Sequence, residues 1–104
     1  MLMHVTLTHT EENCPGYHRE LIPGIINGLE KLDDLAKSCG VKVHFLVTAP
    51  VEHTFFALLE ADTQSAVARF CMEAIPIPQT ARVTPVESRE EVLALGRALV
   101  SGSS

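Results

Sequence analysis

The stretch from residue 41 to residue 61, VKVHFLVTAPVEHTFFALLEA, decides the fold of this chain of 104 residues. It holds two runs rich in β-branched and aromatic residues, 41–48 and 53–61, with only residues 49–52 between them. Two such runs joined by so short a segment predict a β-hairpin. In regular alternation one face carries Val41, Val43, Phe45, Val47, Phe56 and Leu58, and the opposite face carries His44, Leu46, Phe55, Ala57 and Leu59.

Both predicted faces of this hairpin are apolar. A sheet with one face in water normally alternates apolar and polar residues, so we expect something besides the chain's own helices to cover the second face. A second copy of the chain is the simplest cover, because two-fold homodimers are the commonest oligomers. We therefore expect a homodimer that forms through the face bearing His44.

Outward from the hairpin, the N-terminal part predicts a strand and then a helix. Residues 1–10 alternate, with Met3, Val5 and Leu7 on one side. Apolar residues then recur at steps of three and four over 22–39, which predicts one helix ending at Gly40. Gly24 and Gly28 weaken this helix by up to about 1 kcal/mol each relative to alanine.

The C-terminal part predicts a helix, a strand and a last helix. Asp62 is the predicted cap of a helix over about 66–74, because its side-chain oxygen can accept from the first helical N–H groups. A strand over 80–87 is predicted at an edge, because Pro85 lacks a backbone donor. Ser88 and Glu91 form a capping box before the last helix. The order predicts an α+β fold, a ferredoxin-like βαββαβ arrangement with a four-stranded antiparallel sheet, an extra C-terminal helix, one domain over 1–100 and a flexible polar tail over 101–104.

Three segments carry a resemblance to a known family: residues 43–48, VHFLVT, residues 55–61, FFALLEA, and residues 81–86, ARVTPV. They resemble the small ferredoxin-like proteins of the dimeric α+β barrel superfamily. More narrowly, they are similar to a mostly uncharacterised group that includes a nickel-binding protein, with a histidine on the second strand. The resemblance implies a dimeric barrel and makes His44 a possible metal ligand.

Composition narrows the possible partners and the compartment. Eight Lys and Arg face thirteen Asp and Glu, a formal net charge of −5, and no basic cluster suits nucleic acid. The chain shows neither a signal peptide nor a long apolar run, so we expect no membrane association and a cytoplasmic location. Cys14, Cys39 and Cys71 are an odd set at wide spacings, so we expect free thiols, with Cys14 in a loop reacting fastest.

The five histidines provide the candidate site residues. His44 and His53 share one predicted face of the hairpin, and His4 interrupts the first strand. Neutral imidazole suits nickel, zinc or copper, so these residues predict a site for a divalent transition metal or a small ligand. A second constellation, His9, Cys14 and His18, offers thiolate and imidazole ligands from a loop. Either group also fits histidines that serve packing alone.

Three classes of function remain open on these residues. The first is a small homodimer that binds a metal ion or small ligand through its histidines. The second, implied by the resemblance, is a cofactor-independent monooxygenase- or isomerase-like enzyme with a histidine general base in a barrel cavity. The third is a structural or regulatory dimer. The sequence does not decide whether the protein is an enzyme.

Overall fold

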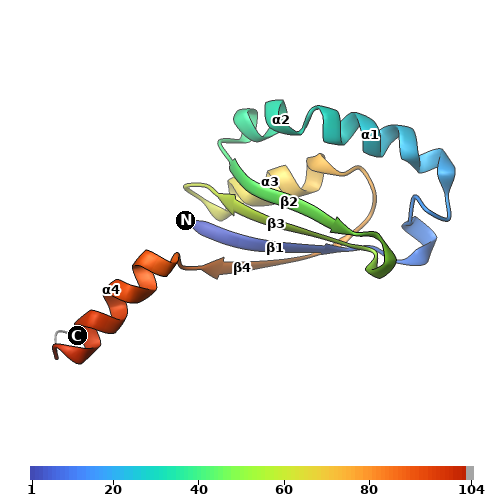
Figure 1. The fold of residues 1–104 in the computed structure, drawn as a ribbon. Helices are drawn as coiled ribbons and strands as arrows, with labels where there is room; N and C mark the ends of the chain where they lie inside the picture. The colour runs from blue at the N-terminus through green and yellow to red at the C-terminus, as the bar shows by residue number, and fades with distance from the viewer. Residues whose placement is uncertain (103–104) are drawn as a thin grey trace.

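Four antiparallel strands form one sheet in the order β2-β3-β1-β4 in the computed structural model, which describes residues 1–102 (Figure 1). The predicted hairpin is confirmed, since β2 and β3 are neighbours. β4 lies at an edge, as Pro85 predicts. Of the predicted tail, residues 101–102 form a turn, and residues 103–104 lie outside the described part. The strands are β1 (Leu2–Thr8), β2 (Lys42–Ala49), β3 (Thr54–Glu60) and β4 (Thr80–Val86).

Three helices lie on one side of the sheet, and the fourth extends away from its end (Figure 1). The covering helices are amphipathic and bury apolar residues such as Val67 and Phe70 against Met3, Val5 and Leu59 of the central strands. The helices are α1 (Ile22–Glu30), α2 (Leu32–Cys39), α3 (Gln64–Ala74) and α4 (Arg89–Val100), with short 3₁₀ turns η1 (Glu11–Asn13), η2 (Arg19–Leu21) and η3 (Pro50–Glu52).

The helix predicted as one element over residues 22–39 is two helices. Lys31, with φ −97° and ψ 7°, leaves the helical conformation between α1 and α2. The apolar stripe keeps its steps of three and four through this interruption, so the pattern does not reveal it. Gly40 ends α2 in the left-handed conformation, φ 74°, as predicted. Thr63, and not Asp62, caps α3, with its Oγ1 accepting a hydrogen bond from the Ala66 N–H at 3.2 Å.

A β-bulge at His44 changes the faces of the hairpin. Val43 lies opposite Leu59, but Phe45 lies opposite Leu58, so His44 is an extra residue in β2. A bulge shifts the alternation by one residue beyond it. Val43 and Leu46 therefore both point to the helices, while Phe45 and Val47 point to the uncovered side.

The predicted dimer face is consequently wrong in most of its members. Phe55, Ala57 and Leu59 are buried in the chain's own core, and Leu46 packs against that core. We call the side of the sheet opposite α1–α3 the open face. The open face carries His4 and His44. Its apolar side chains are half-buried or exposed and include Leu2, Phe45, Val47, Phe56 and Leu58.

The capping box at the start of α4 is formed as predicted. The Glu91 N–H donates to Ser88 Oγ at 3.1 Å, and the Ser88 N–H donates to Glu91 Oε1 at 3.3 Å. Ser88 itself is extended, so α4 continues away from β4. Within residues 1–102, none of the helices has both the length and the apolar character needed to cross a lipid bilayer.

Candidate metal-binding site

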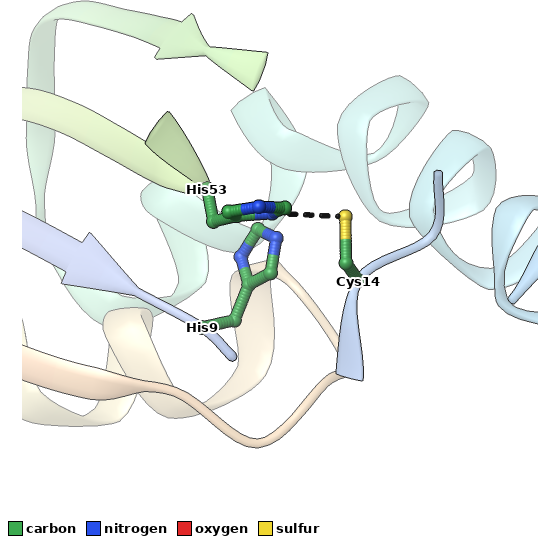
Figure 2. A group of neighbouring side chains, drawn as sticks. All are labelled: His9, Cys14 and His53. Carbon is green, nitrogen blue, oxygen red and sulfur yellow. Dashed lines mark hydrogen bonds between the residues drawn. The ribbon is translucent and has the colours of Figure 1, made fainter. Parts of the chain in front are cut away.

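Three candidate ligands converge at one end of the sheet, although they come from separate parts of the chain. His9 directly follows β1, Cys14 follows η1, and His53 directly precedes β3. The antiparallel pairing of β1 with β3 places the first and last of these side by side, and the His9 N–H donates to the His53 carbonyl at 3.1 Å. Figure 2 shows the three side chains pointing toward one another.

Local backbone geometry holds His53 and Cys14 in place. His53 is the only non-glycine residue with positive φ, 54°, among those described, and its N–H donates to the Pro50 carbonyl at 3.2 Å. The carbonyl of Cys14 accepts hydrogen bonds from the N–H groups of Tyr17, at 3.0 Å, and His18, at 2.9 Å. The loop after β1 thus winds around Cys14 and directs its thiol inward.

The ligand atoms are close enough to share one ion. Nδ1 of His53 lies 3.2 Å from Sγ of Cys14, and the candidate ligand atoms of His9, Cys14 and His53 all lie within 4.8 Å of one another. Tetrahedral zinc with nitrogen and sulfur ligands separates them by about 3.4–3.8 Å, which follows from its bond lengths. The three side chains could therefore hold a metal ion.

Two residues at this site carry buried polar atoms without a well-formed hydrogen bond. His9 is 7% exposed, and neither of its ring nitrogens makes a well-formed hydrogen bond among residues 1–102, although the Gln79 side chain lies close enough to influence the ring. The side-chain oxygen of Gln79, a residue whose side chain lies beside His9, is also buried without a well-formed hydrogen bond. An unsatisfied buried polar group costs about 1–3 kcal/mol, so such groups are rare without a ligand or water. Coordination of a metal ion by His9 would remove part of this cost.

The electrostatic environment keeps His9 neutral. Burial lowers the pKa of His9 below its ordinary value, and the neighbouring His53 lowers it further, while a weak hydrogen bond with the Gln79 side chain raises it. A neutral imidazole has a free electron pair, which is the form that binds metal ions. His9 therefore stays competent for metal binding as the pH falls toward the range in which an exposed histidine takes up a proton.

All three cysteines are free thiols, as predicted. The position of Cys14 in a loop predicts that it reacts fastest. The residue is only 7% exposed, however, whereas Cys39 and Cys71 are half-buried, so the loop position does not make Cys14 the most accessible of the three thiols. Burial raises the pKa of Cys71 to about 11, so that thiol is protonated at neutral pH. Tyr17 stands on the solvent side of the site, with its ring centroid 5.9 Å from that of His53.

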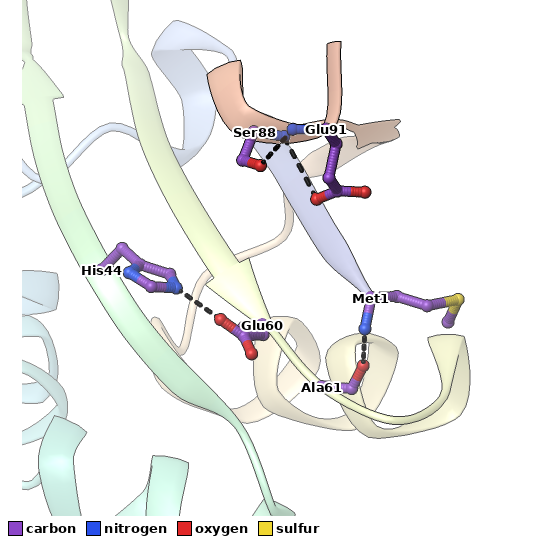
Figure 3. Close-up of polar contacts among 6 residues, drawn as sticks. All are labelled: Met1, His44, Glu60, Ala61, Ser88 and Glu91. Carbon is purple, nitrogen blue, oxygen red and sulfur yellow. Dashed lines mark hydrogen bonds and ion pairs between the residues drawn. The ribbon is translucent and has the colours of Figure 1, made fainter. Parts of the chain in front are cut away.

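The other predicted ligands lie elsewhere. His18 faces Glu20, with Nδ1 and Oε1 3.5 Å apart, and is not in the cluster. His4 lies on the open face, its ring centroid 6.4 Å from that of Phe45 and 6.2 Å from that of Phe56. His44 also lies there, and its Nε2 is 2.9 Å from Glu60 Oε1 (Figure 3). The structure thus joins His53 to His9 and Cys14, and not to His44.

The contact between His44 and Glu60 gives a direct pH prediction. The hydrogen bond from His44 lowers the pKa of Glu60, and Lys42 and the N-terminal amine add to this, against a smaller opposite effect of burial. We expect His44→Ala to raise the pKa of Glu60 toward its ordinary value, measured by NMR titration of the carboxyl carbon. His4→Ala is the control and should leave that pKa unchanged; equal shifts in both variants would contradict the assignment.

Gln79 lies at the site, but no pattern in the sequence singles it out. It lies just before β4, half-buried, and a lone glutamine after a proline carries no ligand signal. Its side-chain oxygen is buried and forms no well-formed hydrogen bond, but the side chain acts on the pKa of His9 as a weak hydrogen-bond partner and therefore lies next to that imidazole. Side chains that orient a ligating histidine fix which ring nitrogen faces the metal.

No protein-family model matches the chain, and no curated protein matches it in sequence.

Proposed function

We propose that this protein binds one transition-metal ion per chain through His9, Cys14 and His53. The observation that carries the proposal is the convergence of His9, Cys14 and His53, whose ligand atoms all lie within 4.8 Å of one another around a buried His9 imidazole that makes no well-formed hydrogen bond. A histidine retained only for packing would be expected to donate to a neighbouring carbonyl or side chain. Here the Gln79 side chain offers at most one weak hydrogen bond to the ring, and the nearest other polar groups, a thiol and an imidazole, are of types that bind metal ions in proteins.

The ligand set favours zinc-like ions. One thiolate and two imidazoles make an N₂S site with one negative charge, which suits zinc or copper and excludes the oxygen-seeking calcium and magnesium ions. Nickel, which the resemblance implied, is the alternative. Three protein ligands leave a fourth position of a tetrahedral ion for water or a small ligand, which is the arrangement of catalytic rather than structural zinc sites.

The proposal includes a cytoplasmic homodimer. Three free thiols suit a reducing compartment. The exposed apolar side chains of the open face support association with a second copy. The strand order β2-β3-β1-β4 is compatible with the ferredoxin-like arrangement and with the dimeric barrel that the resemblance implied.

Titration with cobalt tests the metal site, because cobalt replaces zinc and reports its ligands spectroscopically. We expect one cobalt ion per chain at pH 8, with the absorption of a tetrahedral ion and a thiolate charge-transfer band. Zinc should displace it, and either ion should slow alkylation of Cys14. Affinity should fall with acid, because protons compete for the imidazoles and the thiolate. Absence of binding at pH 8, or a spectrum without the thiolate band, would reject the site.

A substitution of Gln79 tests its role as the orienting residue of His9. We expect Gln79→Leu to weaken zinc binding by about 10–100-fold, the usual effect of losing a side chain that orients a ligand. Competition against a chromophoric chelator measures this. Gln64→Leu, at an exposed position of α3, is the matched control and should bind as tightly as the parent. Equal affinities of both variants would show that Gln79 does not support the site.

A further inference from the structure

The helix α4 has no packing partner within the described chain. None of its residues is buried, and its exposed side chains include Leu95, at 52%, and Leu99, at 64%. Isolated helices shorter than about 12–15 residues are marginal in water, and α4 has 12. The capping box stabilises its start, but an amphipathic helix of this length normally needs an apolar surface to pack on.

A groove at the base of α4 offers such a surface. It has a volume of about 750 Å³ and lies between the open face and the first turn of the helix. Leu2, Leu58 and Val86 give it apolar walls. Figure 3 shows Glu60 and Glu91 at this end of the molecule, and both, with Glu87, make the rim acidic.

The short connection between β4 and α4 keeps the chain's own α4 out of this groove. Only residues 87–88 separate β4 from the helix, and Ser88 is extended, with φ −69° and ψ 163°. The capping box fixes the first turn in that direction, so α4 leads away from the groove (Figure 1). An α4 that comes from a second copy meets no such restriction.

We infer that α4 is an arm that packs on a second copy of the chain, with its C-terminal half in the groove at the base of the partner's α4. This arrangement brings the two α4 helices together antiparallel around a two-fold axis. Each chain then gives and receives the same contact, as a two-fold interface requires. The inference extends the homodimer in the proposed function by naming the element that joins the copies.

Charge complementarity supports a second copy as the occupant. Arg97, in the last turn of α4, has no ion pair within the described residues, whereas Arg89 in the first turn contacts Glu90. Antiparallel packing moves Arg97 of one copy to the acidic rim formed by Glu87 and Glu91 of the other. Arg97, near the C-terminal end of one α4, thus lies beside the carboxylates at the N-terminal end of the partner's α4.

Gly96 independently supports close packing of α4 against a second helix. It lies inside α4, where glycine destabilises a helix by about 1 kcal/mol relative to alanine. A Cβ atom at this position would meet nothing within 4 Å in a single chain. A close approach of a second helix explains a glycine here, since small residues allow backbones to come together.

The available contact area also suits a dimer that uses both the open face and α4. The sheet measures about 19 by 23 Å, from strand spacing and residue rise, or roughly 440 Å² in projection. The side of a 12-residue helix adds roughly 180 Å². A stable interface buries about 800 Å² of accessible surface per partner. Because the accessible surface of a face exceeds its projected area, the open face and α4 together are large enough for such an interface.

Substitutions in α4 of the full-length protein test the arm. We expect the parent protein to be a dimer by light scattering and analytical ultracentrifugation. The double variant Leu95→Asp and Leu99→Asp should raise the dimer dissociation constant at least about 100-fold, as loss of central interface side chains does. Met72→Asp, at an 81% exposed position of α3, is the control and should not change it. Neither α4 residue is buried, so the body should stay folded by circular dichroism.

A charge exchange tests the antiparallel packing. Arg97→Glu should weaken the dimer about fivefold, and adding Glu87→Arg should restore it, because the exchange rebuilds the pair. A photocrosslinker at Leu99 should yield a product of twice the chain mass.

The outcomes separate the proposals. A monomeric parent would overturn both the dimer and the arm, and protected α4 amides in that monomer would show that the chain covers its own helix. A dimer that Phe45→Asp dissociates but the double variant does not would overturn the arm alone. Metal binding is measured separately and does not depend on either result.

Discussion

Replacing Cys14 by serine should lower the affinity for zinc at the proposed site at least about 1000-fold, because a neutral hydroxyl would replace the only thiolate among its three ligands. His9→Phe and His53→Ala should each lower it strongly too, since each removes one of only three ligands. Isothermal titration calorimetry at pH 8 measures the affinities. His18→Ala and His44→Ala are matched controls, because both residues lie outside the cluster, and both variants should bind zinc like the parent.

The same variants should separate in thermal unfolding. An ion present at 100 times its dissociation constant stabilises the folded state by about 2.7 kcal/mol. For a chain of this size, that raises the melting temperature by roughly 10–20 °C. The parent and the two controls should show this increase, and Cys14→Ser should not. Retention of the full increase in Cys14→Ser would place the metal at another position.

Alanine at Gly28 and alanine at Gly24 should have opposite effects on stability, although both positions lie in α1. A Cβ at Gly28 would lie 2.5 Å from the carbonyl oxygen of Ala74, where α1 crosses the end of α3. Such a clash with backbone forces the helices apart and costs about 1–3 kcal/mol, which exceeds the gain in helix propensity of up to about 1 kcal/mol.

At Gly24 the added Cβ would lie 3.5 Å from Cγ of Pro76, an ordinary van der Waals contact. Gly24→Ala should therefore stabilise the protein by up to about 1 kcal/mol. Urea unfolding of both variants measures the two free energies. If both variants gain stability equally, the close approach of α1 to α3 is looser than the structure shows.

The elements of this fold that sequence predicts correctly depend on local signals. Pro85 marks an edge strand through its missing donor, Gly40 ends a helix through its positive φ, and the capping box at Ser88 starts another. Each of these effects acts within one turn or one strand. The break at Lys31 and the bulge at His44 change the backbone without changing the pattern of apolar residues. Alternation and helical spacing therefore do not reveal either feature.

The candidate site was predictable in part. His9 and Cys14 belonged to one predicted constellation, but His53 was assigned to the same face as His44. In an antiparallel β1–β3 pair, the residue after one strand lies beside the residue before the other, and Thr8 does lie opposite Thr54. Given that β1 pairs with β3, this rule alone predicts that His9 and His53 lie side by side. The inward direction of Cys14 was not predictable, because it depends on how the loop winds around its carbonyl.

The bulge at His44 has a consequence for changes in chain length. Deleting one residue from a regular strand inverts every side chain beyond the gap, so strands rarely accept deletions. β2 is the opposite case. Without His44 the strand would read Val43, Phe45, Leu46, Val47 in strict alternation, with Val43 and Leu46 still on the core side. Loss of this codon would make the strand more regular, so sequences one residue shorter at this point are compatible with the same sheet.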